Sequence, residues 1–235
     1  MHIDIVIPVF GDQEENFDTL INSIEEQSHE GSIRIHIAED IIPEKMSNKY
    51  QSLDSSKYSF YSNDRGSQLY ALKNICRVLD SLDEDSIIGI IDGDDCLVGS
   101  DCFSKIHKFH SEGFPVVWTA NAWDLNGMNH SGPMDDSQDV YHHPWVSSHF
   151  RTFRLGLYNS ISKTNFLNEK GEFFEKCYDQ ALMLPIIHMA HLLGYKTKYI
   201  PEVHYLYKGR IQPESEGREL QLRYENFIRE RGYVA

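Results

Sequence analysis

Hydrophobic residues in the first half of the chain gather in short runs, separated by stretches where they recur every three or four positions. Residues 3–9 and 87–91 are nearly unbroken apolar runs rich in β-branched side chains, a pattern typical of strands buried on both faces of a sheet. Further strands are predicted at residues 32–38, 58–61 and 115–119. Helical spacing predicts helices at residues 16–27, 68–82 and 100–111. This alternation predicts an α/β fold with a mostly parallel central sheet flanked by helices.

The second half of the chain follows a different pattern. Residues 120–148 are rich in Asn, Gly, Asp, His and Pro and show little periodicity, which predicts a long functional or mobile loop. We expect this loop to order over a bound ligand and to exclude water from it. Residues 151–158 are predicted to be a strand or a short helix. The remaining predicted elements are a helix at 178–193, strands at 196–200 and 203–207, and a charged helix at 214–231.

Composition limits the partners that the protein can have. The 235 residues carry a formal net charge of −14, which argues against broad binding to nucleic acid or to an anionic membrane. The four cysteines form no CxxC pair, which favours reduced thiols in a cytoplasmic protein. No signal peptide and no apolar run of about 20 residues is evident, so we expect at most peripheral contact with a membrane.

An acidic cluster follows the apolar run at 87–91. Asp92, Asp94 and Asp95 fall within four positions at the predicted end of a strand, where open α/β sheets bind their ligands. Crowded carboxylates suit a hard divalent cation such as Mn²⁺ or Mg²⁺, which would in turn hold a phosphorylated ligand. The alternative is an acidic turn, with Gly93 at a positive φ and the aspartates capping the next helix. The buried strand before the cluster favours the metal site.

The segment 145–154 combines aromatic, imidazole and guanidinium groups. Arg151 offers the forked donor geometry that suits phosphate, while Trp145 and His149 could contact a donor or acceptor sugar. The alternative is a surface segment whose aromatic rings simply pack, and the residues alone leave both open.

The order of these parts resembles the family 2 glycosyltransferases of the GT-A fold. The matching pieces extend from residue 3 to about residue 208: they are the run 5–10, Glu39-Asp40, the Asp92-Gly93-Asp94-Asp95 cluster, Asp179 at the start of a helix, and the segment 194–202. The resemblance implies a single GT-A-like domain over residues 1–235. Residues 1–119 would form its nucleotide-sugar and metal half, residues 120–213 its acceptor half, and residues 214–235 a C-terminal helix.

The resemblance implies roles for individual residues. Pro8 and Phe10 would contact the nucleotide sugar, Asp40 the base and Asp92 the ribose. Asp94 would bind the metal. Asp179 resembles the catalytic base that deprotonates the acceptor hydroxyl, although a plain helix cap is its alternative role. His204 stands where some members place a further contact to metal or diphosphate.

The sequence departs from the usual pattern of the family at two places. The usual Asp-Asp-Gly-Ser-Thr run is Glu-Asp-Ile-Ile-Pro at 39–43, which leaves the base specificity open, and Tyr178 replaces the Glu before Asp179. Negative charge builds on the leaving phosphate when a sugar is displaced from a nucleoside diphosphate, and Lys208 or Arg210 could stabilise it beside a metal.

The prediction is therefore a metal-dependent glycosyltransferase. It would move a sugar from a nucleotide-sugar donor, with a UDP-sugar favoured, to a hydroxyl of a glycan, lipid-linked or protein acceptor, and it would invert the anomeric centre. One alternative is a nucleotide-sugar-binding module whose catalytic apparatus has decayed, for which Tyr178 and the altered loop after the second strand are the best support. Another is a haloacid-dehalogenase-like phosphatase, in which the first Asp is a nucleophile; Cys96-Leu97 fits that motif poorly.

Overall fold

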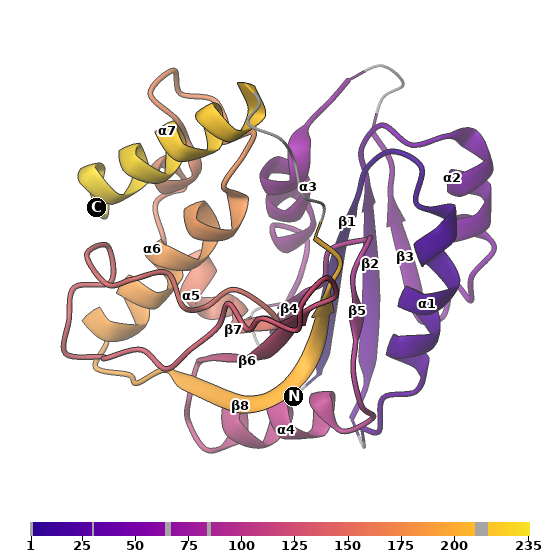
Figure 1. Ribbon diagram of the computed structural model, residues 1–235, viewed down its shortest axis with the longest axis horizontal. Helices are drawn as coiled ribbons and strands as arrows, with labels where there is room; N and C mark the ends of the chain where they lie inside the picture. Colours follow the sequence, from indigo (N-terminus) through magenta and orange to yellow (C-terminus); the bar gives the residue numbers. More distant parts are fainter. Residues whose placement is uncertain (1, 30, 64–66, 84–85, 210–215) are drawn as a thin grey trace.

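The computed structural model describes residues 2–29, 31–63, 67–83, 86–209 and 216–235. One curled mixed sheet of eight strands, in the order β3-β2-β1-β4-β7-β6-β8-β5, forms its centre (Figure 1). The first four of these strands run parallel to one another. They are β3 (Tyr58–Tyr61), β2 (Ile33–Glu39), β1 (Ile3–Val9) and β4 (Ile87–Ile90). The predicted α/β class and the single sheet flanked by helices are confirmed.

The other four strands make the sheet mixed. Strand β7 runs antiparallel to both β4 and β6, β8 runs parallel to β6, and the two-residue β5 is antiparallel to β8. Their bounds are β7 (Arg151–Arg154), β6 (Val116–Trp123), β8 (Lys198–Tyr207) and β5 (Cys96–Leu97). Because β7 is antiparallel to β4, the start of β7 lies beside the carboxyl end of β4.

Helices cover both faces of the sheet because both faces are apolar. One hydrophobic cluster joins β1 and β2 to α1 (Glu14–Glu25), α2 (Glu44–Gln51) and α4 (Cys102–Ser111). The cluster on the opposite face involves α3 (Tyr70–Leu79), α5 (Leu155–Asn159), α6 (Tyr178–Leu192) and α7 (Glu216–Arg231), with a 3₁₀ turn at Lys163–Phe166 beside them. Strands β1 and β4 lie between these layers, which explains their unbroken apolar sequences.

Several boundaries differ from the sequence prediction. Strand β6 continues to Trp123, four residues into the expected loop. The two strands expected at 196–200 and 203–207 are one strand, β8, whose register against β6 shifts near Ala120. Residues 151–158 supply both a strand and a short helix, and β5 escaped prediction because two residues carry no periodic signal.

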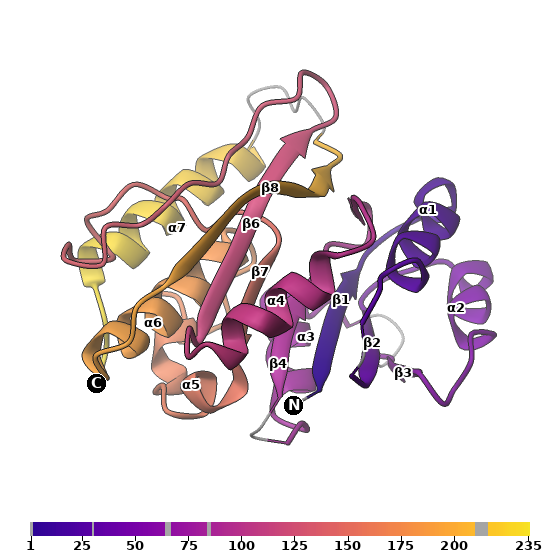
Figure 2. The same cartoon turned by 90° about the horizontal axis from the view of Figure 1, so that it is seen from below.

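The rest of the 120–148 segment is held against the protein by hydrogen bonds. Trp118 Nε1 donates to the Gly132 carbonyl at 2.9 Å, and the Gly132 N–H donates to the Val146 carbonyl at 3.0 Å. Arg229 of α7 donates to the Tyr141 and His143 carbonyls at 3.0 and 2.9 Å. Figure 2 shows this segment running alongside α7. These contacts do not support a free lid over the whole segment.

None of the described helices has both the length and the apolar character needed to cross a bilayer.

Candidate functional site

The turn after β4 is folded tightly onto the end of β1. The Gly93 N–H donates to the Pro8 carbonyl at 3.3 Å, and the Asp95 N–H donates to the Asp92 carbonyl at 3.0 Å. A Cβ at Gly93 would lie 2.3 Å from Gln13 Oε1 and 2.7 Å from a methyl group of Val9. Only glycine therefore fits here, and this close approach points the flanking aspartates along the carboxyl edge of the sheet.

Asp95 is the buried carboxylate of this turn. Its Oδ2 accepts a hydrogen bond from the Tyr205 hydroxyl at 2.7 Å, and its Oδ1 accepts one from the Lys208 N–H at 2.8 Å. Burial, and then the charges of Asp92 and Asp94, raise the pKa of Asp95 to about 8. Among the described residues Asp95 forms no ion pair with a positive side chain, and a bound cation would relieve this condition.

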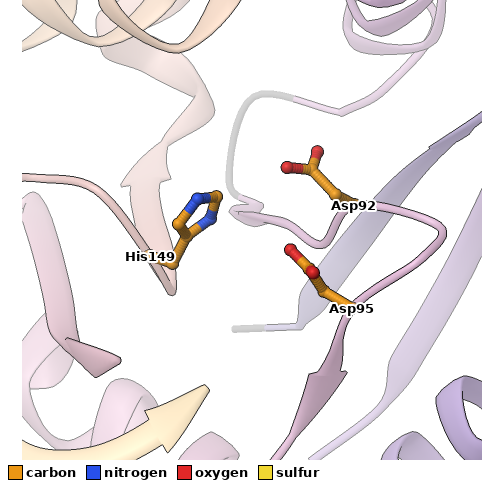
Figure 3. Close-up of side chains that lie close together, drawn as sticks. All are labelled: Asp92, Asp95 and His149. Carbon is orange, nitrogen blue, oxygen red and sulfur yellow. The ribbon is translucent and has the colours of Figure 1, made fainter. Parts of the chain in front are cut away.

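Asp92, Asp95 and His149 point toward one another from two separate loops (Figure 3). Each offers one ligand atom, and these atoms all lie within 4.8 Å of one another. Mg²⁺ prefers ligands that are all oxygen atoms. A set of two carboxylates and one imidazole therefore suits Mn²⁺ better than Mg²⁺. The donor set therefore fits a divalent cation.

The ring of His149 has other contacts that bear on this fit. It stacks on Tyr205 and Tyr207, with ring centroids 4.7 and 5.2 Å away. Its Nδ1 accepts a hydrogen bond from Arg151 Nη2 at 3.2 Å. Burial, and then the charge of Arg151, lowers the pKa of His149 well below its ordinary value, so the ring is neutral. The hydrogen bond to Arg151 would have to give way if Nδ1 bound a metal.

Arg151 is a fully buried cation at the start of β7. Its Nη2 lies 3.7 Å from Asp92 Oδ2, and its Nη1 lies 3.9 Å from Asp179 Oδ2. Burial alone would lower the pKa of Arg151, but neighbouring Tyr178, Asp92 and Asp179 raise it. Within the described residues, its Nε and Nη1 donate no hydrogen bond. These two buried donor atoms are therefore unsatisfied beside the acidic turn, and the contact of Arg151 with a nucleotide sugar stays a prediction.

Tyr178 and Asp179 reach the same place from the first turn of α6. The Tyr178 hydroxyl donates to Asp92 Oδ1 and accepts from Arg151 Nη2. Burial raises the pKa of Asp179, while the charge of Arg151 opposes that shift. Cys177, before the helix, adopts a left-handed conformation with φ of 60°. A strained residue at this point is common beside functional groups.

Other predicted residues lie near this group or away from it. Asp94 is half-buried in the same turn as Asp92. The Lys208 ammonium donates to Asn16 Oδ1 of α1 at 2.8 Å. The ring of His204 faces the segment 98–105, with Nδ1 3.3 Å from the Val98 carbonyl and Nε2 3.3 Å from Lys105 Nζ. His204 therefore does not join the group of Asp92, Asp95 and His149, and Arg210 lies outside the described residues.

The predicted nucleotide-sugar contact Phe10 and the predicted base contact Asp40 follow the neighbouring strands β1 and β2. Phe10, after β1, is 55% exposed, which leaves its ring available to a ligand. The carboxylate of Asp40, after β2, accepts from the Leu69 and Tyr70 N–H groups, both at 2.9 Å. It therefore holds the start of α3. Trp145 is half-buried and packs against the hydrophobic cluster beneath α6, as the packing alternative for its segment expected.

Sequence reasoning did not assign roles to three residues of the site, Asp95, Tyr205 and Tyr207. Asp95 was visible in the acidic cluster, but burial distinguishes it from Asp94 and no sequence pattern shows that. The two tyrosines alternate along β8, as side chains on one face of a strand do. That spacing was a usable signal, although it did not show which face meets the carboxylates.

Comparison of the sequence with protein-family models and with curated proteins gave no match. The structure does resemble solved structures. The crystal structure of S. aureus TarS aligns with a TM-score of 0.64 and 14% identity over 89% of this chain and 37% of that chain. TarS 1–349 in complex with UDP gives a TM-score of 0.64 and 14% identity, and covers 89% of this chain. TarS 1–349 in complex with UDP-GlcNAc gives a TM-score of 0.61 and 16% identity, and covers 93% of this chain.

These similarities show a shared fold. At 14–16% identity they do not assign this chain to a family. The chain also spans only part of those proteins, 61% of each TarS 1–349 chain. The chain therefore shares the α/β fold of the TarS structures.

Proposed function

We propose that this protein is a glycosyltransferase that uses a nucleotide-sugar donor, with a UDP-sugar favoured. The observation that carries the proposal is the meeting of Asp92, Arg151, Tyr178 and Asp179 at the carboxyl edge of β4. The fold supports it, because similar structures were solved with UDP and UDP-GlcNAc bound. The same comparison favours a glycosyltransferase over the phosphatase alternative.

The two halves of the chain would divide the work. Residues 1–119 would hold the nucleotide through Pro8, Phe10, Asp40 and Asp92. Residues 120–213 would face the acceptor, which is a glycan, lipid-linked or protein hydroxyl, and residues 214–235 would support that half through α7. Arg151 enters from the second half and keeps two donors for the diphosphate.

A divalent cation would be held by Asp92, Asp95 and His149. Asp94, in the same turn, is the ligand that the family resemblance implies. When bound, it would supply positive charge where the leaving diphosphate becomes more negative. Lys208 would add charge from the protein side: its N–H contacts Asp95, and its ammonium, which donates to Asn16, would turn toward the diphosphate.

Asp179 would act as the general base. Burial raises its pKa, which makes it a stronger proton acceptor, while the charge of Arg151 opposes that shift. It would take the proton of the acceptor hydroxyl while that oxygen attacks the anomeric carbon. Direct attack from the face opposite the diphosphate would invert the anomeric centre. Tyr178 and Arg151 would hold Asp92 and Asp179 in position for this step.

Donor turnover tests the proposal and separates it from a decayed binding module. UDP-GlcNAc and other UDP-sugars are incubated with the protein and Mn²⁺, and release of UDP is measured with and without glycan acceptors. The proposal expects UDP release that needs Asp179. Binding of UDP without any release would favour the decayed module, and absence of nucleotide binding would contradict both.

A further inference from the structure

One side chain, that of Tyr205 in β8, contacts all three members of the cation group, which are Asp92, Asp95 and His149. Its hydroxyl accepts a hydrogen bond from the Asp92 N–H at 3.0 Å and donates to Asp95 Oδ2 at 2.7 Å. Its ring stacks on the imidazole of His149, with the ring centroids 4.7 Å apart and the planes inclined by 12°. Tyr205 therefore links the turn after β4 to the loop before β7.

The hydroxyl of Tyr205 holds the Asp95 carboxyl group in one orientation. A tyrosine hydroxyl has one proton to donate. Because the Asp92 N–H donates to the hydroxyl oxygen, that proton is directed to Asp95. The Lys208 N–H donates to the other carboxyl oxygen of Asp95, so rotation of the group would break both hydrogen bonds. A carboxylate has about four lone-pair sites, and those that the protein does not use are left for a cation.

The ring of Tyr205 is itself held in place by the core. It is fully buried, and it stacks on Phe150 with centroids 6.3 Å apart and planes inclined by 8°. Phe150 is also fully buried and lies against Gly89 of β4, where a Cβ would be 2.6 Å from the phenyl ring. The position of Tyr205 is therefore fixed by close packing from behind, and the hydroxyl transmits that position to the acidic turn.

A register shift in β8 decides that Tyr205, and not its neighbour, faces the cation group. Ala120 of β6 pairs with Val203, but the next residue, Asn121, pairs with Tyr205, which leaves His204 as an extra residue between them. Without the shift, His204 would lie opposite Asn121, and Tyr205 would point to the other face of the sheet. The bulge therefore explains both the position of Tyr205 and the displacement of His204 from the site.

We infer that Tyr205 is a positioning residue of the cation group, and that it holds Asp95, the Asp92 backbone and the His149 ring in the arrangement that binds a divalent cation. This inference rests on the proposed function. Tyr205 would act through these three residues and not as a metal ligand, because its hydroxyl is already engaged on both sides. Removal of an outer partner that orients metal ligands typically weakens metal binding by about 10- to 100-fold.

Titration with Mn²⁺ in the presence of UDP tests the inference, with free Mn²⁺ measured by electron paramagnetic resonance. Tyr205→Phe keeps the stacked ring and removes only the hydroxyl, so it should weaken Mn²⁺ binding by about tenfold or more. Tyr158→Phe is the matched control, because Tyr158 of α5 is also fully buried and its hydroxyl donates to Asp80 Oδ1 at 2.8 Å. Both variants should unfold at lower urea concentration than the wild-type protein, but Tyr158→Phe should keep the Mn²⁺ affinity within about threefold.

Replacement of Tyr205 with 4-aminophenylalanine is a rescue experiment. It keeps the ring and returns an N–H donor to Asp95, so the Mn²⁺ affinity should recover to within about threefold of the wild-type value. This variant also decides the question if Tyr205→Phe does not fold.

Three results would overturn the inference: wild-type Mn²⁺ affinity in a folded Tyr205→Phe variant, an equal loss in Tyr158→Phe, or no recovery with 4-aminophenylalanine. Each of them leaves the proposed function standing. Absence of Mn²⁺ binding by the wild-type protein would overturn the cation group and this inference together. The proposed function itself fails if the wild-type protein neither binds UDP nor releases it from a UDP-sugar.

Discussion

The guanidinium of Arg151 lies 3.7 Å from the carboxylate of Asp92. Arg151 begins β7 and Asp92 follows β4, two strands that are neighbours in the sheet but far apart in the chain. The Arg151 side chain is 1% exposed and that of Asp92 is 21% exposed. A buried cation needs such partners, since burial without them is strongly unfavourable. This contact therefore ties the stability of the sheet to the geometry of the candidate site.

Arg151→Gln should lower the free energy of unfolding by about 3 kcal/mol, because it leaves Asp92 and Asp179 without a positive partner. Urea unfolding at pH 7 measures the change. Arg223→Gln is the control: its ion pair with Glu169 at 3.1 Å is on the surface, and its loss should cost less than about 1 kcal/mol. Similar losses in the two variants would contradict the role given to Arg151.

Asp95→Asn should weaken Mn²⁺-dependent binding of UDP by about tenfold or more, because it removes one carboxylate of the cation group. Addition of EDTA to the wild-type protein should have a similar effect. The family resemblance expects the same of Asp94→Asn. His204→Gln should change the affinity by less than about threefold, since its ring contacts Val98 and Lys105 instead. An affinity for UDP that does not change when EDTA is added would contradict the proposed metal site.

Asp179→Asn should reduce sugar transfer by about 10²–10⁴-fold while UDP affinity changes little, because the base is lost and the donor site is kept. Asn suits a helix terminus about as well as Asp, so a loss of transfer cannot be assigned to a lost cap. Rates of UDP release with saturating donor measure the effect. Transfer near the wild-type rate would leave Asp179 with a structural role only.

Asp4 should make stability depend on pH in the acid range. Burial would raise its pKa, but hydrogen bonds from His36 at 2.7 Å and Arg34 at 2.8 Å outweigh burial and lower the pKa far below the ordinary value. The native state then binds fewer protons than the unfolded state, so this stabilisation is present above about pH 4 and is lost as the pH falls.

Asp4→Asn should therefore be less stable than the wild-type protein by about 3 kcal/mol at pH 7, with a difference that shrinks steadily below about pH 4. Urea unfolding at a series of pH values measures it. A difference that stayed constant from pH 7 to pH 3 would show that Asp4 stabilises the fold through something other than its charge.

Limited proteolysis should cut the 120–148 segment at its tip first. Residues 124–130 are exposed, and Leu125 and Met128 are each 52% exposed, whereas residues 131–148 are tied to β6 and α7. Chymotrypsin followed by mass spectrometry should find early cleavage within 124–130. Cleavage that begins instead between 135 and 145, and that UDP with Mn²⁺ suppresses, would restore the lid expected from the sequence.

Local patterns predicted most of the elements because their signals lie within a few residues. The apolar runs of β1 and β4 reflect burial on both faces, and the helices α1, α3 and α6 repeat their apolar residues at helical spacing. Strand β5 and the continuous β8 depend on pairing with strands distant in the chain, so no local sequence pattern predicted them.

By itself the sequence determined the α/β class, the acidic turn at the end of β4 and the position of Asp179 at the start of a helix, because each follows from neighbouring residues. Only the tertiary structure decided which side chains meet. It brought Arg151 and Tyr178 to Asp92, joined Asp95 and His149, and turned His204 toward the segment 98–105. These contacts join strands and helices that are distant in the chain. Their packing decides which side chains are buried and which charges lie close together, and the spacing of neighbouring residues in the sequence does not show either.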